Sequence, residues 1–179
     1  MLKPRLTVIV AMILAAVASR LAPHPWNLTS VTAVALFGGA YFQDRRLAFA
    51  IPLAALFLSD LVLGFYPGLP LVYLSFALVV VLGVWLSSRR RPPFIAGAAL
   101  LSSVMFFAVT NFGVWAFGSI YPRTLAGLES CYLAAIPFFR GSVEGDLLYT
   151  FVLFGGFALL ERRFLGLRDP QDIGALRAA

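Results

Sequence analysis

The fold is decided by residues 47–65, which read LAFAIPLAALFLSDLVLGF. The stretch holds a single charged side chain, Asp60. A helix of this length is about 28 Å long, because each residue adds roughly 1.5 Å. The hydrocarbon layer of a membrane is about 30 Å thick. Pro52 falls near the first turns of such a helix, where its missing N–H costs least. The stretch therefore predicts a membrane-spanning helix.

The composition of the whole chain agrees with this prediction. Of its 179 residues, 61% are hydrophobic and 12% are charged, whereas soluble domains carry about 25% charged residues. Too few polar groups remain to cover a water-facing surface, and lipid is the solvent that fits. We expect an all-α integral membrane bundle forming one transmembrane domain over residues 1–179. The apolar runs predict six spans, at about residues 6–21, 30–42, 47–65, 71–86, 94–110 and 147–160.

Two of these spans carry an alternative. The first apolar run also fits a cleavable signal peptide, but we favour a retained helix because the segments after it are themselves spans. The run at residues 30–42 is short, so it must be tilted or buried inside the bundle.

The basic residues orient the bundle. All but three of the 14 Lys and Arg residues fall on one side of the six spans, and the exceptions are Arg20, Arg123 and Arg140. Because Lys and Arg accumulate in cytoplasmic loops, both termini, including the tail at residues 161–179, are expected in the cytoplasm. The net charge of +6 does not predict nucleic-acid binding, since the basic residues form small clusters between apolar runs.

The longest connection, residues 111–146, is expected on the outer side. It is rich in aromatic residues, and residues 124–135 predict a short helix with Thr124 as N-cap and Pro137 as its end. Long ordered loops often carry function. We therefore expect this partly helical outer loop to form a lid over the bundle.

Asp60 is the first candidate for a functional residue. An ionisable group within a span is costly unless it faces a partner or a wet cavity. Two interpretations stay open at this point. Asp60 contacts a ligand, proton or cation, or it locks two helices together, for example through an Arg near the outer surface.

The outer side offers further candidates for a substrate-binding pocket. Pockets for small molecules combine aromatic walls with a few convergent polar groups. The alternative is an aromatic belt at the boundary between lipid and water. The candidate residues, beside Asp60, are Trp26, Asn27, Asn111, Trp115, Tyr121, Arg140 and Asp146.

The sequence gives no sign of an enzyme. It has no His-Glu-x-x-His motif and no Walker A loop, and its only histidine, His24, lies between two prolines outside the spans. A single cysteine, Cys131, excludes an internal disulfide and a multi-cysteine metal site. It is interpreted as a small buried residue. We expect neither a cofactor nor a metal.

Several blocks together resemble an uncharacterised family of bacterial membrane transport proteins. They lie at residues 35–42, 59–65, 110–115, 121–128, 131–132, 135–139 and 145–149. That family in turn resembles the S components, the substrate-binding subunits, of energy-coupling factor vitamin transporters. The resemblance implies six helices in a bacterial cytoplasmic membrane and an outward-facing site beneath loops. It also implies a small-residue stripe on the first helix that docks a T component with its ATPase subunits, and Ala11 and Ala15 match its spacing.

Two functions remain open from the sequence. The preferred one is a membrane-embedded solute-binding and uptake component that takes a vitamin-like small molecule from the outer side. The alternative is a membrane scaffold or assembly protein whose outer loop docks a partner.

Overall fold

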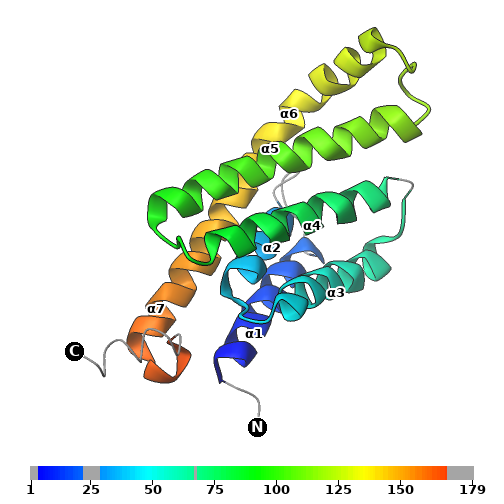
Figure 1. Ribbon diagram of the computed structural model, residues 1–179. Helices are drawn as coiled ribbons and strands as arrows, with labels where there is room; N and C mark the ends of the chain where they lie inside the picture. The colour runs from blue at the N-terminus through cyan, green and yellow to red at the C-terminus, as the bar shows by residue number, and fades with distance from the viewer. Residues whose placement is uncertain (1–3, 22–28, 67, 169–179) are drawn as a thin grey trace.

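The computed structural model describes residues 4–21, 29–66 and 68–168, and this part of the chain is entirely helical (Figure 1). The helices are α1 (Pro4–Ala18), α2 (Val31–Tyr41), α3 (Arg45–Leu63), α4 (Leu69–Leu86), α5 (Pro92–Phe117), α6 (Leu125–Thr150) and α7 (Gly156–Arg163). Two 3-10 turns, η1 (Ser19–Leu21) and η3 (Leu165–Leu167), follow α1 and α7. A π-helical segment, η2 (Phe151–Gly155), joins α6 to α7.

Five helical segments are long and apolar enough to cross a membrane. They are Pro4–Leu21, Arg45–Leu63, Leu69–Leu86, Pro92–Phe117 and Leu125–Arg163. Large apolar side chains on their outer faces are exposed, among them Val62, Val81, Val104 and Phe151. Exposure on this scale suits lipid rather than water, so the chain is a multi-pass membrane protein.

The short helix α2 forms the centre of the bundle. All 11 of its residues are buried, and it packs against α1, α3, α4, α5 and α6. This confirms that the run at 30–42 is helical and buried, although α2 is only about 16 Å long. Its closest neighbour is α4. A Cβ atom at Gly39 would clash with the carbonyl oxygen of Val80, so a glycine is required where the two backbones meet.

One end of the bundle is held together by Arg5, and we call it the basic end because Arg45, Arg46 and Arg89–Arg91 also lie there. The Arg5 side chain is buried and its Nη1 atom lies 2.6 Å from Oε1 of Glu161 in α7. Its guanidinium group also packs on the Phe157 ring, 5.3 Å from the ring centre. The start of α1 and the end of α7 therefore lie at the same end (Figure 1).

The structure differs from the expected lid at residues 111–146. Helix α5 continues to Phe117, α6 begins at Leu125, and only seven residues, 118–124, connect them. Thr124 is the predicted N-cap, and its side chain accepts a hydrogen bond from the N–H of Gly127 at 3.1 Å. Pro137, however, lies inside α6. Membrane helices tolerate an internal proline because neighbouring groups compensate for the lost hydrogen bond, so Pro137 does not end the helix.

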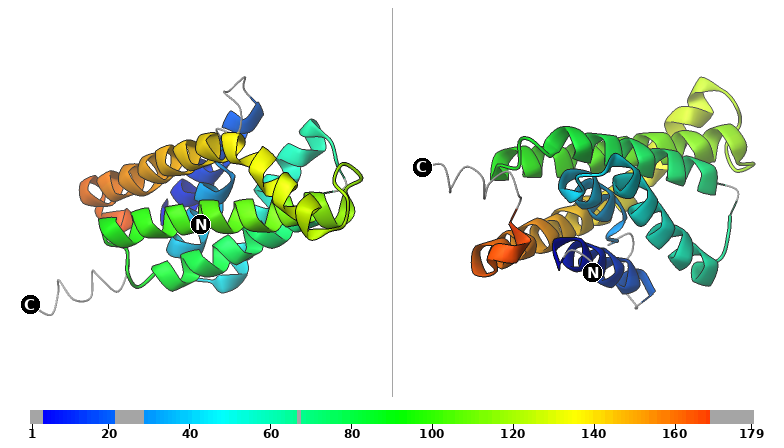
Figure 2. Two further views of the ribbon diagram at one scale, coloured as in Figure 1. Left: turned by 90° about the horizontal axis from the view of Figure 1, so that it is seen from above. Right: turned by 60° about the horizontal axis from the view of Figure 1, so that its bottom comes forward.

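The expected loop is thus a helical hairpin, and the expected sixth span at 147–160 is the second half of a helix that runs from Leu125 to Arg163. In Figures 1 and 2 the connection between α5 and α6 projects beyond the end of α3 and the start of α4. We call this the hairpin end of the bundle, opposite the basic end.

Candidate functional site

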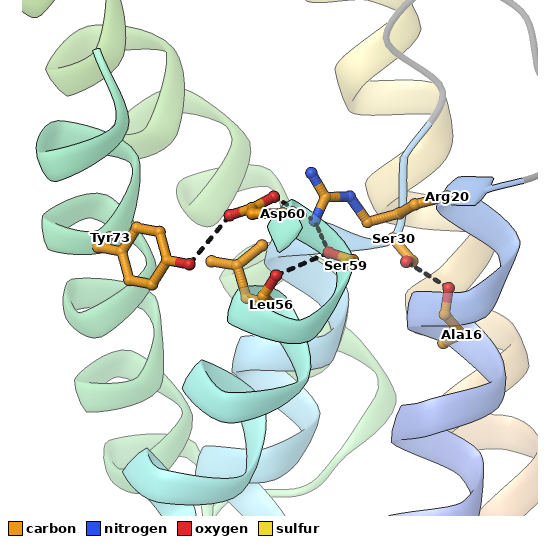
Figure 3. A network of polar contacts seen from close by, with 7 residues as sticks. All are labelled: Ala16, Arg20, Ser30, Leu56, Ser59, Asp60 and Tyr73. Atoms are coloured by element: carbon orange, nitrogen blue, oxygen red, sulfur yellow. Dashed lines mark hydrogen bonds and ion pairs between the residues drawn. The ribbon is translucent and has the colours of Figure 1, made fainter. Parts of the chain in front are cut away.

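Asp60 lies in the last turn of α3 and is fully buried. Its Oδ1 atom is 3.2 Å from Nη1 of Arg20 in η1, and its Oδ2 atom accepts a hydrogen bond from the Tyr73 hydroxyl of α4 at 3.0 Å (Figure 3). Arg20 also donates to the Ser59 hydroxyl. Asp60 therefore joins α3 to α4 and to the end of α1, as the interpretation of a helix–helix lock expects.

Arg20 also faces a cavity of about 430 Å³ near the hairpin end. The cavity lies among η1, the start of α2, the start of α4, α5 and α6. Its lining residues are Arg20, Thr29, Val31, Tyr66, Val72, Ser103, Phe106, Phe107, Thr110, Asn111, Ala135, Phe138, Phe139 and Ser142.

The lining combines apolar rings with a few hydrogen-bonding groups. Phe107 and Phe139 pack together with ring centres 4.7 Å apart, so one wall has a defined aromatic shape. The phenol of Tyr66 is also part of the lining. Burial, and then the negative charge of Asp60, raises the pKa of Tyr66, which keeps it a neutral hydrogen-bond donor. The guanidinium group of Arg20 is the cationic group of the lining.

A second buried carboxylate, Asp146 in α6, lies next to the cavity. Its Oδ2 atom accepts a hydrogen bond of 2.6 Å from the Ser103 hydroxyl of α5, and Ser103 is itself part of the lining. The Thr32 side chain of α2 lies beside the same carboxyl group. Asp146 thus sits where α2, α5 and α6 meet.

The predicted site residues fall into different positions. Asn111 lines the cavity, and its amide donates to the carbonyl oxygen of Phe107 at 2.8 Å. The indole N–H of Trp115 instead donates to the carbonyl oxygen of Pro122 at 3.0 Å, which fastens the α5–α6 connection. Tyr121 is half-buried in that connection. Arg140 is exposed and pairs with Glu144 at 2.8 Å.

Of the remaining candidates, Trp26, Asn27 and His24 lie outside the described residues. Ala11 and Ala15 are exposed on α1. Cys131 is buried, with its Sγ atom 3.5 Å from the carbonyl oxygen of Asn111, as expected of a small residue within a packed helix pair. In the described ranges no group of three or more His, Cys, Asp or Glu side chains could hold a metal ion.

Reasoning from the sequence missed Arg20, Ser103, Thr32 and Tyr73. Arg20 had a signal, because a cation at the end of one apolar run is a natural partner for an acid within another. The hydroxyl residues had none, since serine and threonine in membrane helices commonly bond their own backbone.

Comparisons with known proteins identify the family of the chain. A family model described as "Family of unknown function (DUF6580)" matches residues 1–171. The chain therefore belongs to the DUF6580 family, which confirms that the sequence blocks mark one uncharacterised family over nearly the whole chain. No curated protein and no solved structure matches it.

Proposed function

We propose that this DUF6580 protein is a membrane-embedded solute-binding and uptake component that binds a small molecule in the cavity at the hairpin end. The observation that carries the proposal is the cavity itself. Its volume of about 430 Å³ falls within the range of roughly 300–1,000 Å³ typical of ligand pockets.

The lining supports one class of ligand. Phe106, Phe107, Phe138 and Phe139 offer ring faces, which suit a flat or apolar body. Arg20 and Asn111 offer N–H groups, and the Asp60 carboxylate already balances the charge of Arg20. The best match is a small vitamin-like molecule with a planar body and a carbonyl or carboxylate group that accepts a hydrogen bond.

The proposal also implies an orientation of the protein in the membrane and an external source of energy for transport. The basic end would face the cytoplasm, so the cavity would open toward the outer side of a bacterial cytoplasmic membrane. Because the chain has no ATP-binding motif, transport would need a T component and ATPase subunits. The exposed positions of Ala11 and Ala15 agree with a docking stripe on α1, as the resemblance to S components implies.

A scaffold function is the second candidate, and the tip of the hairpin favours it. Ile120 is 77% exposed and Leu125 is 84% exposed, so the tip presents apolar side chains that a partner protein could cover. A scaffold would use this tip and would need no occupied cavity.

Mass spectrometry of small molecules retained by the detergent-purified protein separates the two functions. An uptake component should retain one molecule in near-stoichiometric amount. Phe107→Ala should reduce its affinity at least about tenfold, a loss of about 1.4 kcal/mol. The matched control is Leu133→Ala, which removes an exposed side chain of α6 and should leave retention unchanged. A protein that retains nothing, or a Phe107→Ala variant that retains as much as the parent, contradicts the uptake function.

A further inference from the structure

We propose that Asp146, together with the hydroxyl groups of Ser103 and Thr32, forms a buried binding site for a monovalent cation between α2, α5 and α6. The site goes beyond the proposed uptake function, because it holds whether or not a solute occupies the cavity. Four features of the described residues lead to it.

The first feature is an uncompensated carboxylate. Asp146 is buried, and no Lys or Arg in the described part of the chain is paired with it; the ion pairs there are Arg5–Glu161, Arg20–Asp60 and Arg140–Glu144. A hydroxyl group donates a hydrogen bond but carries no charge. An isolated carboxylate within a membrane protein is therefore expected to be neutralised by a cation or a proton.

The second feature is that the surrounding helices supply no counter-charge. Helix α5 contains no ionisable side chain, and α2 contains only Tyr41, which lies at its far end near Arg5. On α6 itself, Arg140 is exposed and paired with Glu144, and the Tyr149 hydroxyl is hydrogen-bonded to Ser19 at 2.7 Å. The neutralising charge must come from outside these elements.

The third feature is a pair of buried hydroxyl groups without a regular hydrogen bond. Thr32 and Thr150 are 3% and 4% exposed. The Thr150 hydroxyl has no hydrogen-bond partner within the described residues, and the Thr32 hydroxyl is close enough to Asp146 to stabilise its charge but makes no hydrogen bond of regular geometry. Thr32 lies beside the Asp146 carboxyl group. Thr150 follows Asp146 by four residues, so the two share a helix face. Buried hydroxyls are normally satisfied, and carboxylate and hydroxyl oxygens are the ligands that hard cations prefer.

The fourth feature is access. The Ser103 hydroxyl bonds to Asp146, and Ser103 also lines the cavity, so the carboxylate is in direct contact with a residue of the cavity wall. The helix changes from α to π at Phe151, directly after Thr150. Such π-helical turns occur often at functional sites. A small cation in the cavity would thus reach Asp146 by displacing one hydroxyl group.

Two cations fit this chemistry, a proton and Na⁺, and thermal unfolding of the purified protein in detergent distinguishes them. The melting temperature is measured while Na⁺ replaces choline at constant ionic strength. The series is run once at mildly alkaline pH and once at mildly acidic pH. A cation that binds only the folded state raises the melting temperature, by an amount on the order of 5 °C when it is in about 100-fold excess over its dissociation constant. A rise with Na⁺ at alkaline pH identifies Na⁺. A rise on acidification without any Na⁺ response identifies the proton.

Variants decide whether Asp146 carries the response. Asp146→Asn should abolish it, whereas Glu144→Gln, an exposed change on the same helix, should keep it. If Asp146→Asn does not fold, Ser103→Ala retains the carboxylate and should shift the midpoint of the response about tenfold to higher cation concentration, a change of about 1.4 kcal/mol.

A parent protein that responds to neither cation overturns the proposal, and so does an Asp146→Asn or Ser103→Ala variant with an unchanged response. Loss of retained solute with an intact cation response would count against the uptake function alone.

Discussion

Asp60 and Asp146 are both carboxylates buried within membrane helices, at 2% and 3% exposure, but their surroundings are opposite. Asp60 has a cation, Arg20, at 3.2 Å and a phenol donor, Tyr73, at 3.0 Å. Asp146 has the Ser103 hydroxyl at 2.6 Å and no basic partner among the described residues. Burial alone therefore does not define the role of an intramembrane acid. A paired carboxylate fixes helices in place, whereas one held only by hydroxyls can exchange its counter-ion.

The largest effect is expected from breaking the Asp60 pair on one side. Arg20→Ala leaves a buried, uncompensated carboxylate, which costs about 3–5 kcal/mol in the free energy of unfolding. Unfolding in mixed detergent measures this loss. The double variant Arg20→Ala/Asp60→Ala should be more stable than Arg20→Ala alone, because no charge remains unpaired. Equal stability of the two variants would mean that Asp60 and Arg20 do not depend on each other.

The next prediction concerns neutralising each acid in turn. Asp60→Asn should destabilise the protein by about 2–3 kcal/mol, since Arg20 then loses its counter-charge. Asp146→Asn, compared in cation-free buffer at alkaline pH, should stabilise it by about 1–2 kcal/mol, since an uncompensated charge is removed. The same unfolding assay gives both values. If Asp60→Asn and Asp146→Asn change the free energy of unfolding in the same direction, the two carboxylates do not differ in the way described.

A smaller difference is expected when one hydrogen-bond donor is removed from each acid. Ser103→Ala removes the hydroxyl that donates to Asp146 at 2.6 Å and should cost about 2 kcal/mol. Tyr73→Phe takes one of two donors from Asp60, whose charge remains balanced by Arg20, and should cost about 1 kcal/mol. A larger loss for Tyr73→Phe than for Ser103→Ala would contradict the assigned surroundings.

The smallest effect is expected at an ion pair that water or lipid headgroups can screen. Arg140→Gln breaks the exposed pair with Glu144, and such pairs contribute little to stability. No change in melting temperature should be measurable. A clear loss of stability would indicate that the hairpin packs against another element around Arg140.

The helical character and most of the spans could be predicted because a membrane helix must be apolar along its whole length. The same pattern identified Asp60, since a single charge is conspicuous in residues 47–65. The boundary near residue 111 could not be found, because residues 112–117 are as apolar as the rest of α5 and Pro137 looks like a stop. The sequence indicated an Arg near the outer surface as a possible partner of Asp60, but it did not identify Arg20, because the pairing depends on how α1 and α3 are rotated and tilted against each other.

The candidate site was predicted only in part for the same reason. Asn111 lines the cavity, but Trp115 and Arg140 do not belong to its lining. The spacing of residues in the sequence does not predict which face of a long helix lines a cavity. Ser103 and Thr32 carry no signal in the sequence, since their importance comes from the carboxylate that α6 places beside them.

The continuous helix from Leu125 to Arg163 has a consequence for the surrounding lipid. Its 39 residues make it about 58 Å long, nearly twice the thickness of the hydrocarbon layer, about 30 Å. A helix longer than the hydrocarbon layer is accommodated by inclination in the membrane. A helix inclined this way responds to membrane thickness, since a thinner bilayer favours greater inclination. The lipid composition of the membrane thereby acts on the wall that α6 contributes to the cavity.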